Sequence, residues 1–222
     1  MLSESILSRD EYISEILGQE QSPADMLCLR CQQREGFLRC QDCFSRHVLC
    51  LGCCLKVHQE SPFHHIEKWT GLFFQATSLS EEGFVLHLGH DGALCPKAQS
   101  DSGTQESQAG GRGRADNEKV LVAVDVSGVH QLQIGWCRCE GAPGADIQLL
   151  RSRLFPATIT NPSTVFTFRL LNHFHIDSVE CKTSALSFFS KLRRLTSDTS
   201  PSSVPVGFLV TLLTPHMSYP HL

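Results

Sequence analysis

Long hydrophobic runs are absent from this 222-residue sequence, and their absence excludes two classes of protein. The best run, residues 206–213, is far shorter than the ~18 apolar residues of a membrane span and contains Thr211. The first twenty residues are acidic and hold no apolar stretch of the ~7–15 residues that a signal peptide requires. We therefore expect an intracellular protein, nuclear or cytoplasmic, that is neither secreted nor embedded in a membrane.

An excess of basic charge is also lacking. The chain has 19 Lys and Arg against 23 Asp and Glu, a net charge of −4 and a pI near 6.2. The surface as a whole therefore cannot form the broad basic patch of many nucleic-acid-binding proteins, and any such contact must be local. No internal repeat or sustained heptad pattern occurs, whereas 41% hydrophobic residues are enough for a packed core in one or two domains.

Cysteine and histidine, in contrast, are abundant, with eleven of each. In a reducing compartment, clustered cysteines are more often metal ligands than disulfides. The odd number of cysteines would also leave one thiol unpaired in any scheme made only of disulfides. The composition therefore points to metal binding.

Residues 28–70 hold seven of the eleven cysteines and only twelve large apolar residues. A segment of ~40 residues with so little apolar surface rarely folds through burial alone and usually needs metal or disulfide staples. The regular C-x-x-C pairs are typical of zinc sites, because one tight turn brings two thiolates to the same ion. The candidate ligands are Cys28, Cys31, Cys40, Cys43, Cys50, Cys53, His58 and His64.

Eight ligands correspond to two tetrahedral zinc ions, and the short intervals favour a cross-brace. In it, one ion is bound by Cys28, Cys31, Cys50 and Cys53, and the other by Cys40, Cys43, His58 and His64. Because protein fills all four positions of each ion, we expect structural and not catalytic zinc. Such ions contribute roughly 10–16 kcal/mol of apparent binding energy. Cys54 could replace Cys53, and His65 could replace His64, whereas His47 is expected to be solvated.

A second constellation outside this segment offers five candidates for one further ion: His90, Cys95, His130, Cys137 and Cys139. If residues 129–139 form a regular strand, Cys137 and Cys139 face the same side and His130 faces the other. His90 is then the better fourth ligand. A third zinc site and a pair of buried thiols both remain open as interpretations.

The periodicity of the remaining sequence predicts a mixed α and β organisation. The Ser8-Arg9-Asp10-Glu11 capping box opens a short helix in an acidic segment, residues 1–27. Alternating apolar residues predict strands over 119–125 and 129–139 around a turn at Ser127-Gly128, and helix-like spacing occurs over 166–176 and 184–195. The predicted segments are 1–27, 28–70, 71–97 with 118–199, a flexible loop over 98–117, and an atypical tail over 200–222.

Several of these motifs occur together in a known family. They are the cluster of residues 28–64, Leu88-Gly89-His90 with Cys95, Asp125-Val126-Ser127-Gly128-Val129-His130 before Cys137-Arg138-Cys139, Gln148-Leu149-Leu150, Leu154-Phe155-Pro156-Ala157-Thr158, residues 162–168 and Leu192-Arg193-Arg194-Leu195-Thr196. The chain resembles, over roughly residues 8–198, the cysteine-cluster domain found before the catalytic region of KDZ (Kyakuja-Dileera-Zisupton) transposases. These are mobile-element proteins abundant in fungi.

The resemblance implies a noncatalytic zinc-binding accessory module of transposase origin that acts in the nucleus through DNA or a protein of the transposition machinery. The expected fold is small α+β, with an N-terminal B-box-like or treble-clef-like zinc cross-brace before a mixed α/β part with a β-hairpin and C-terminal helices. The catalytic domain of the family would begin beyond this chain. Residues 204–222 lack Lys, Arg, Asp and Glu and depart from the family pattern, so we expect a truncated or mispredicted product.

Three kinds of function compete. Residues 138–194 carry eight Lys and Arg against four acids, which would suit DNA contact, although a solvated helix face explains them equally well. The spacing of the first cluster also resembles a B-box, so a B-box-like or RING-like protein-interaction module of the ubiquitin system is the alternative. A thiol enzyme using Cys54 or Cys181 is disfavoured, because Cys54 adjoins zinc ligands and Cys181 is expected to be a small core residue.

Overall fold

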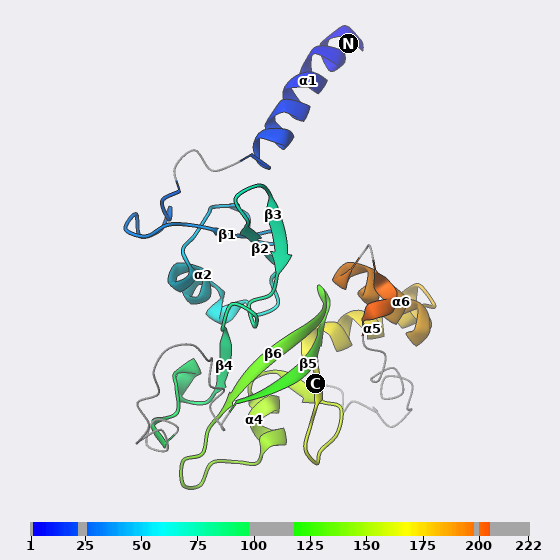
Figure 1. Ribbon diagram of the computed structural model, residues 1–222. Coiled ribbons are helices and arrows are strands. Elements are labelled where there is room, and N and C mark those ends of the chain that lie inside the picture. Colours follow the sequence, from blue (N-terminus) through cyan, green and yellow to red (C-terminus); the bar gives the residue numbers. More distant parts are fainter. Residues whose placement is uncertain (1, 22–25, 98–117, 198–199, 205–222) are drawn as a thin grey trace. The chain divides into compact units, whose positions relative to one another are not determined.

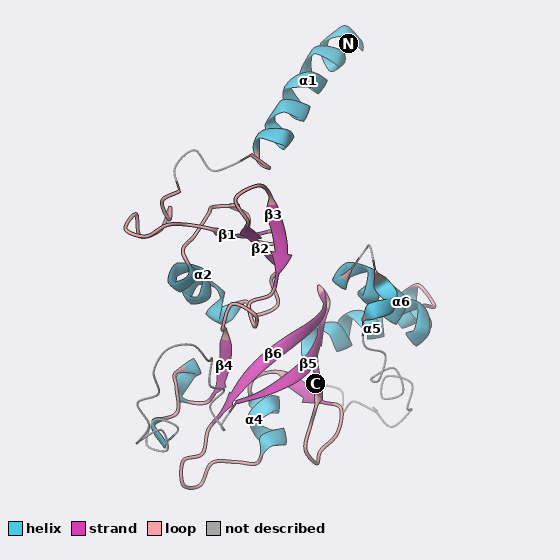
Figure 2. Ribbon diagram, in the orientation of Figure 1, coloured by secondary structure: helices cyan, strands magenta, loops and turns pink. Residues whose placement is uncertain are grey.

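The computed structural model describes residues 2–21, 26–97, 118–197 and 200–204, which divide between two compact units, 1–82 and 83–222. These residues form five α-helices and two β-sheets, so the predicted small α+β class is confirmed (Figure 2). The finer division into segments stays a prediction. The loop predicted over 98–117 and most of the tail predicted over 200–222 lie outside the described residues.

In the first unit, a three-stranded antiparallel sheet stands beside a short helix (Figure 1). The strands are β1 (Leu38–Cys40), β2 (Ile66–Trp69) and β3 (Phe74–Thr77), and α2 is Leu51–Val57. Strand β1 pairs with β2 so that Cys40 lies opposite Ile66. This pairing connects the middle of the cysteine-rich segment to its end.

Helix α1 (Leu2–Gly18) begins six residues before the predicted start at Ser8, so that prediction is wrong. The residues before Ser8 include good helix formers, and a serine inside a helix costs only a few tenths of a kcal/mol to about 0.7 kcal/mol. The capping box therefore does not stop the helix from extending toward the N-terminus. None of the described helices is long and apolar enough to cross a bilayer.

A buried arginine joins the end of this helical segment to the sheet. The Arg39 side chain is 3% exposed, and its Nε donates to Oε2 of Glu67 at 2.6 Å. It also donates to the carbonyl of Gln19 at 2.7 Å and to Oε2 of Glu20 at 2.5 Å. Its guanidinium lies 3.7 Å from the centre of the Phe74 ring. Because each polar group of this buried cation has a partner, the charge is well compensated.

The second unit is built on a five-stranded mixed sheet with strand order β4-β6-β5-β8-β7. The strands are β4 (Val85–Leu88), β5 (Glu118–Asp125), β6 (Gly128–Trp136), β7 (Leu154–Pro156) and β8 (Thr164–Thr167). The predicted hairpin is confirmed, since β5 and β6 pair antiparallel from Asp125–Gly128 outward. Strand β4 pairs parallel with β6, and β5 pairs parallel with β8.

The helices of this unit are α4 (Ala145–Arg151), α5 (Phe168–Glu180) and α6 (Ala185–Thr196). The last two confirm the predicted C-terminal helices and lie side by side in Figure 1. Helix α5 starts two residues later than predicted, because residues 166 and 167 complete strand β8 and Thr167 caps the helix by accepting from the amide of Leu170.

The core of the unit lies between the sheet and helices α5 and α6. Its fully or nearly fully buried members are Val124, Phe166, Leu170, Leu171, Phe188, Phe189 and Leu192. The hairpin turn meets the end of α6, where the amide of Val129 donates to Oγ1 of Thr196 at 2.7 Å. A Cβ atom on Gly128, whose φ is +141°, would lie 2.8 Å from that oxygen. A glycine is therefore required at this contact.

A buried aspartate holds the hairpin to the helices. Asp125 is 1% exposed and accepts hydrogen bonds from Oγ1 of Thr167 at 2.6 Å, from Oγ of Ser127 at 2.9 Å and from Nη2 of Arg169 at 2.8 Å. Burial is the largest influence on the pKa of this carboxyl and raises it, but these donors together outweigh burial and lower the pKa. Asp125 is therefore an ionised structural group.

Cys181 is exposed at the C-terminal end of α5, so the prediction of a small core residue is wrong. The buried positions of α5 are Leu170 and Leu171, in its first turn. The helix ends at Glu180, so Cys181 is its C-cap residue and lies beyond the turn that packs into the core.

Candidate metal centres

The first candidate centre contains Cys28, Cys31, Cys50 and Cys53, whose sulfur atoms all lie within 4.8 Å of one another. Cys28 and Cys31 belong to one turn, closed by a hydrogen bond from the amide of Gln32 to the carbonyl of Cys28 at 2.8 Å. Cys50 is the N-cap residue of α2, and Cys53 follows within that helix. The helix therefore carries the second C-x-x-C pair toward the first.

The sulfur atoms in this group have the spacing that a tetrahedral zinc ion requires. Zn–S bonds of about 2.3 Å place two sulfurs about 3.8 Å apart. The Sγ atoms of Cys31 and Cys50 are 3.9 Å apart. Burial raises the pKa of Cys28, but hydrogen bonds from the backbone of Cys31, Cys50 and Arg30 outweigh it and lower the pKa to about 6. Such amide donors favour the thiolate form that binds metal.

The second candidate centre contains Cys40, Cys43, His58 and His64. Nδ1 of His64 lies 3.5 Å from Sγ of both Cys40 and Cys43, and Nε2 of His58 lies 3.6 Å from Sγ of Cys43. Zinc bound to one sulfur and one nitrogen in tetrahedral geometry gives a distance of about 3.6 Å between them. The side chains therefore fit one zinc ion.

The hydrogen bonds around the second centre orient its ligands. Nδ1 of His58 lies 2.7 Å from the carbonyl oxygen of Cys54, so Nδ1 carries the proton and Nε2 is free to act as a ligand. The amide of Cys43 donates to Sγ of Cys40 at 3.3 Å, as expected in a C-x-x-C turn. The fold thus supplies both the ligands and the groups that hold them.

The alternative ligands that the sequence left open lie outside these groups of four. Cys54 is fully buried in α2, and burial raises the pKa of its thiol to about 12. His65 is held by Asp42, whose Oδ2 accepts from the backbone amide of His65 at 2.6 Å and lies 2.9 Å from Nδ1 of its ring. Cys53 and His64 are thus the members that the fold brings together. His47 is exposed, as predicted.

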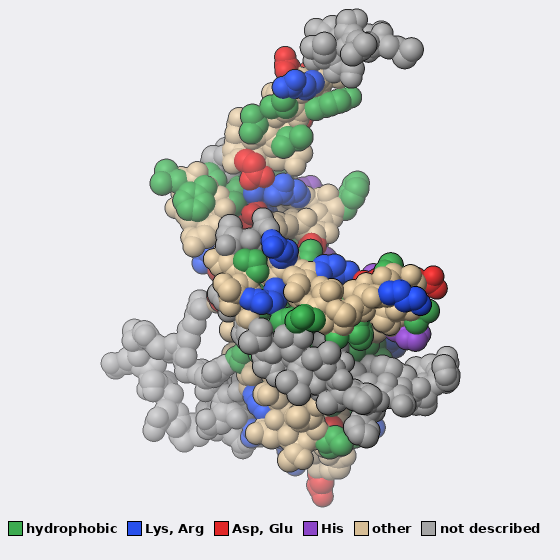
Figure 3. All heavy atoms as spheres, turned by 90° about the vertical axis from the view of Figure 1, so that its right-hand side faces the viewer, with side chains coloured by type: hydrophobic (Ala, Val, Ile, Leu, Met, Phe, Trp, Pro, Cys, Tyr) green, Lys and Arg blue, Asp and Glu red, His purple; other side chains and the backbone are tan. Residues whose placement is uncertain are grey.

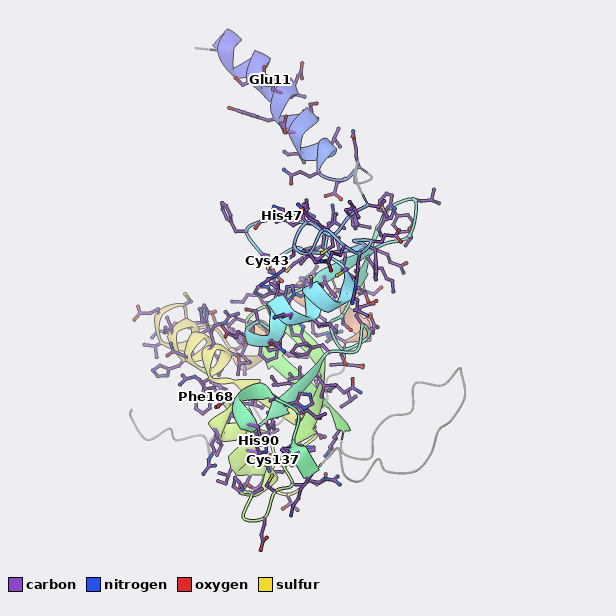
Figure 4. All side chains as sticks on the ribbon, turned by 90° about the vertical axis from the view of Figure 1, so that its left-hand side faces the viewer. Glu11, Cys43, His47, His90, Cys137 and Phe168 are labelled. Carbon is purple, nitrogen blue, oxygen red and sulfur yellow. The ribbon has the colours of Figure 1, made fainter. Side chains whose placement is uncertain are left out.

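The third candidate centre contains His90, Cys95, Cys137 and Cys139 (Figure 4). Nε2 of His90 lies 3.3 Å from Sγ of Cys137 and 3.4 Å from Sγ of Cys139, and the sulfurs of Cys95 and Cys139 are 3.7 Å apart. His130 is elsewhere, with Nε2 3.0 Å from Oγ of Ser127. The structure therefore selects His90 for this group.

The pKa of the Cys139 thiol reflects the close approach of sulfur atoms in this group. The neighbouring Cys95 thiol, followed by burial, raises the pKa of Cys139 to about 11. Thiolates this close repel one another, and a divalent cation at their centre removes that penalty. The donor set of three sulfurs and one imidazole is one of the common structural zinc sets.

The reason given from sequence for pairing Cys137 with Cys139 is wrong, because strand β6 ends at Trp136. Both cysteines lie in the following loop. There the Gln148 side chain from α4 replaces a strand partner, since its Oε1 accepts from the amide of Cys137 at 2.9 Å. Its Nε2 donates to the carbonyls of Cys137 at 3.0 Å and Pro143 at 2.9 Å. The loop is therefore fixed by one buried amide.

Gln148 and Gly89 have no role that the sequence indicates. The role of Gln148 depends on its burial beside the fully buried Leu149 in α4, which only the structure shows. Gly89 has a φ of +149°, and a Cβ atom there would lie 3.1 Å from Cβ of Cys137. Glycine therefore allows the chain before His90 to approach the cysteine loop closely.

Replacing Gln148 by Ala is expected to weaken zinc binding at the third centre by about 10–100-fold, the usual effect of removing a partner that orients a metal site. The substitution leaves the backbone of Cys137 without its hydrogen bonds and does not change a ligand. Competition with a chromophoric zinc chelator would measure the affinity. Gln131→Ala, at an exposed position of β6, is the matched control. Equal affinities for the two variants would contradict this role of Gln148.

Many basic side chains of the second unit are engaged within the fold. Arg169 pairs with Asp125, Lys191 with Asp177 at 3.0 Å, and Arg193 donates to the carbonyl of Pro201 at 2.5 Å. Lys119 donates to Asn161 and Pro162. The Lys and Arg side chains visible in Figure 3 are scattered among hydrophobic and other side chains. Several of the residues that suggested DNA contact therefore already have an acidic or carbonyl partner within this unit.

Comparison with known proteins gives one family and no individual relative. Residues 79–200 match the family model described as "CxC2 like cysteine cluster associated with KDZ transposases". The match contains the third centre and both helices α5 and α6, whereas the first two centres precede it. Searches of curated proteins and of solved structures found no match. Because the matched residues are more than half of the 222, the chain belongs to the CxC2-like cysteine cluster family associated with KDZ transposases.

Proposed function

We propose that the chain is a noncatalytic accessory module of KDZ-transposase origin, held in shape by three structural zinc ions, that mediates an interaction with a protein or with DNA. The observation that carries this proposal is the presence of three groups of four Cys and His ligand atoms, each group within 4.8 Å. The distances within each group match those around tetrahedral zinc.

We further propose that the first two ions interlock in a cross-brace. Support comes from the order of the ligands, because the pairs beginning at Cys28, Cys40, Cys50 and His58 alternate between the two groups along the chain. Helix α2 begins after one ligand of the first ion and is followed directly by His58 of the second. Each ion then limits the movement of the loops that bind the other.

The proposal of a noncatalytic role rests on coordination and burial. Four protein ligands leave a tetrahedral ion without an open position for water or substrate. Cys54 is fully buried, which removes it from contact with a substrate. Cys181 is exposed, but among the described residues no histidine lies within hydrogen-bonding distance of its sulfur to act as a base.

Between the two kinds of partner, the contacts of the basic side chains favour a protein. Nucleic-acid affinity depends on several Lys and Arg groups that contact phosphates together. Arg169, Lys191 and Arg193 instead form contacts within the second unit.

The alternation of the first eight ligands also supports a B-box-like role in the ubiquitin system, which is the second candidate function. Ubiquitin transfer in the presence of charging enzymes would support its enzymatic form.

The test of the proposed function is the zinc content of the purified full chain by elemental analysis. Three ions per chain are expected, and removal by a chelator should unfold the first unit. Two ions would eliminate the third centre, and a metal-free chain with an unchanged fold would overturn the proposal.

A duplex-binding titration at several salt concentrations tests the DNA role, because each phosphate contact gives a slope of about −0.9 in a plot of log K against log salt.

A further inference from the structure

A cavity of about 440 Å³ lies beside the second candidate centre, within the first unit. Besides three ligands of that centre, its lining combines two kinds of side chain. Leu29, Leu49 and Val57 provide apolar surface, and Arg30, Ser45 and His47 provide polar groups. A volume of this size is sufficient for one large side chain with part of its backbone.

The polar groups of the lining have no partners within the described part of the chain. No hydrogen bond or ion pair joins the side chain of Arg30, Ser45 or His47 to another described residue. All three residues are exposed, so their donors are accessible. The neighbouring Arg46, in contrast, is paired with Glu20 at 3.3 Å and Glu67 at 3.6 Å. The cavity therefore has hydrogen-bond donors and a cationic guanidinium that are available to a bound partner.

Apolar side chains next to the cavity are unusually exposed. Leu29 is 56% exposed, and Phe44, which lies between Cys43 and Ser45, is fully exposed at 106%. Figure 4 shows Cys43 and His47 on the loops that carry this surface. Burial of such side chains by a partner is favourable by about 25 cal/mol for each Å² removed from water. The metal centre beside them holds these loops in place without ligand, which reduces the entropy lost on binding.

We propose that this cavity binds an extended peptide segment in which a large aliphatic or aromatic side chain stands next to an Asp or Glu residue. The apolar side chain enters the space between Leu29, Leu49 and Val57. The carboxylate accepts hydrogen bonds from the Arg30 guanidinium, with Ser45 and His47 as further donors. This inference rests on the proposed interaction role and names its partner class as an acidic, apolar peptide.

A peptide fits this site better than a nucleic acid for two reasons. The lining offers one guanidinium, whereas nucleic-acid binding requires several cations along a phosphate backbone. The apolar lining and the exposed Phe44 can pack against an apolar side chain of a peptide, but they cannot bind a phosphate. The chemistry of the cavity thus selects one class of partner.

The experiment uses the zinc-loaded full chain and a set of fluorescent eight-residue peptides, measured by fluorescence anisotropy. The central pair of the peptides combines Leu, Phe or Ser with Glu, Gln or Lys. We expect Leu-Glu and Phe-Glu peptides to bind, the Gln versions to bind at least fivefold more weakly, and Ser-Glu and Leu-Lys peptides to show no binding. Equal binding of Glu, Gln and Lys peptides would overturn the proposal.

Matched variants locate the binding to the cavity. Arg30→Ala should weaken Leu-Glu binding at least fivefold, whereas Arg34→Ala, an exposed arginine near the same turn and outside the lining, should not change it. Leu29→Ser should have a similar effect, with Leu27→Ser, at a residue 52% exposed and outside the lining, as its control. If the Arg30 and Arg34 variants bind alike, the cavity is not the site.

Two further outcomes separate this inference from the proposed function. Three zinc ions per chain together with no peptide binding would overturn the inference and leave the zinc-held module intact. Binding of a fluorescent DNA duplex that is lost in Arg30→Ala would also overturn it, because the cavity would then serve a phosphate. Zinc content is measured for every variant, so that a loss of binding cannot be confused with a loss of the metal centre.

Discussion

Replacing Cys31 by Ser in the full chain is expected to lower the zinc content by two ions and not by one. Cys31 belongs only to the first centre, but α2 carries Cys50 and Cys53 of that centre and leads directly into His58 of the second. If the first centre loses its order, the ligands of the second centre should therefore also lose their positions. The third centre, whose ligands lie in the other compact unit, should keep its ion.

The first unit has little else to stabilise it. Among its described residues, the buried hydrophobic side chains other than cysteine are Leu38, Ile66 and Leu79. At about 1.5–3 kcal/mol for each buried side chain, their contribution is smaller than the roughly 10–16 kcal/mol of one structural zinc. The Cys31 variant should therefore also lose the far-UV circular dichroism of this unit and become sensitive to proteolysis between residues 26 and 82.

Two matched variants control for the substitution itself. Cys95→Ser should remove one ion, that of the third centre, and Cys181→Ser should remove none because Cys181 is exposed and outside the three groups. Elemental analysis gives the zinc content of all three variants. A Cys31 variant that retains two ions would contradict the interlocking of the first two centres.

Replacing Phe188 by Ala is expected to destabilise the second unit by about 3–5 kcal/mol, the usual cost of truncating a buried phenylalanine. Phe188 is 1% exposed, and its ring centre lies 5.1 Å from that of Phe174 across the pair of helices α5 and α6. The Lys191 ammonium lies 4.8 Å from the same ring. The substitution removes these contacts and leaves a cavity between the helices and the sheet.

Hydrogen exchange of the α6 amides in zinc-loaded protein would measure this effect, since two compact units need not unfold in one transition. Leu186→Ala is the control, because Leu186 is on the same helix but 61% exposed. Its effect should stay within about 0.5 kcal/mol. Similar losses of protection for the two variants would show that Phe188 is not part of a close-packed core.

Local patterns predicted those parts of the fold that depend on neighbouring residues. The alternation of Val120, Val122 and Val124 and the turn at Ser127-Gly128 were sufficient for the β5–β6 hairpin. The C-x-x-C pairs indicated the cysteines that the fold gathers into the first two groups, because a tight turn fixes two such side chains at once. His90 was preferred over His130, and the structure places His90 with the three cysteines, although the strand geometry assumed for Cys137 and Cys139 was wrong.

The pairing of strands that are distant in the sequence could not be predicted from local patterns. Strand β4 pairs parallel with β6, and β5 with β8, and nothing in the periodicity of a single strand indicates its partner. The role of Gln148 depends on where α4 places its side chain relative to a loop eleven residues earlier. The exposure of Cys181 depends on the residue at which α5 ends, and helix ends are the least certain part of a prediction from sequence.

The sequence separations within the three centres affect the order in which the chain folds during synthesis. All eight candidate ligands of the first two centres lie within residues 28–64, so both sets leave the ribosome within a short interval. Cys95 must instead wait for Cys139, 44 residues later, which takes about 2–9 s at 5–20 residues per second. During that interval, Cys95 is a nascent thiol without the other members of its group. In the proposed zinc-held module, metal binding at the third centre is therefore the step that is most sensitive to the speed of translation.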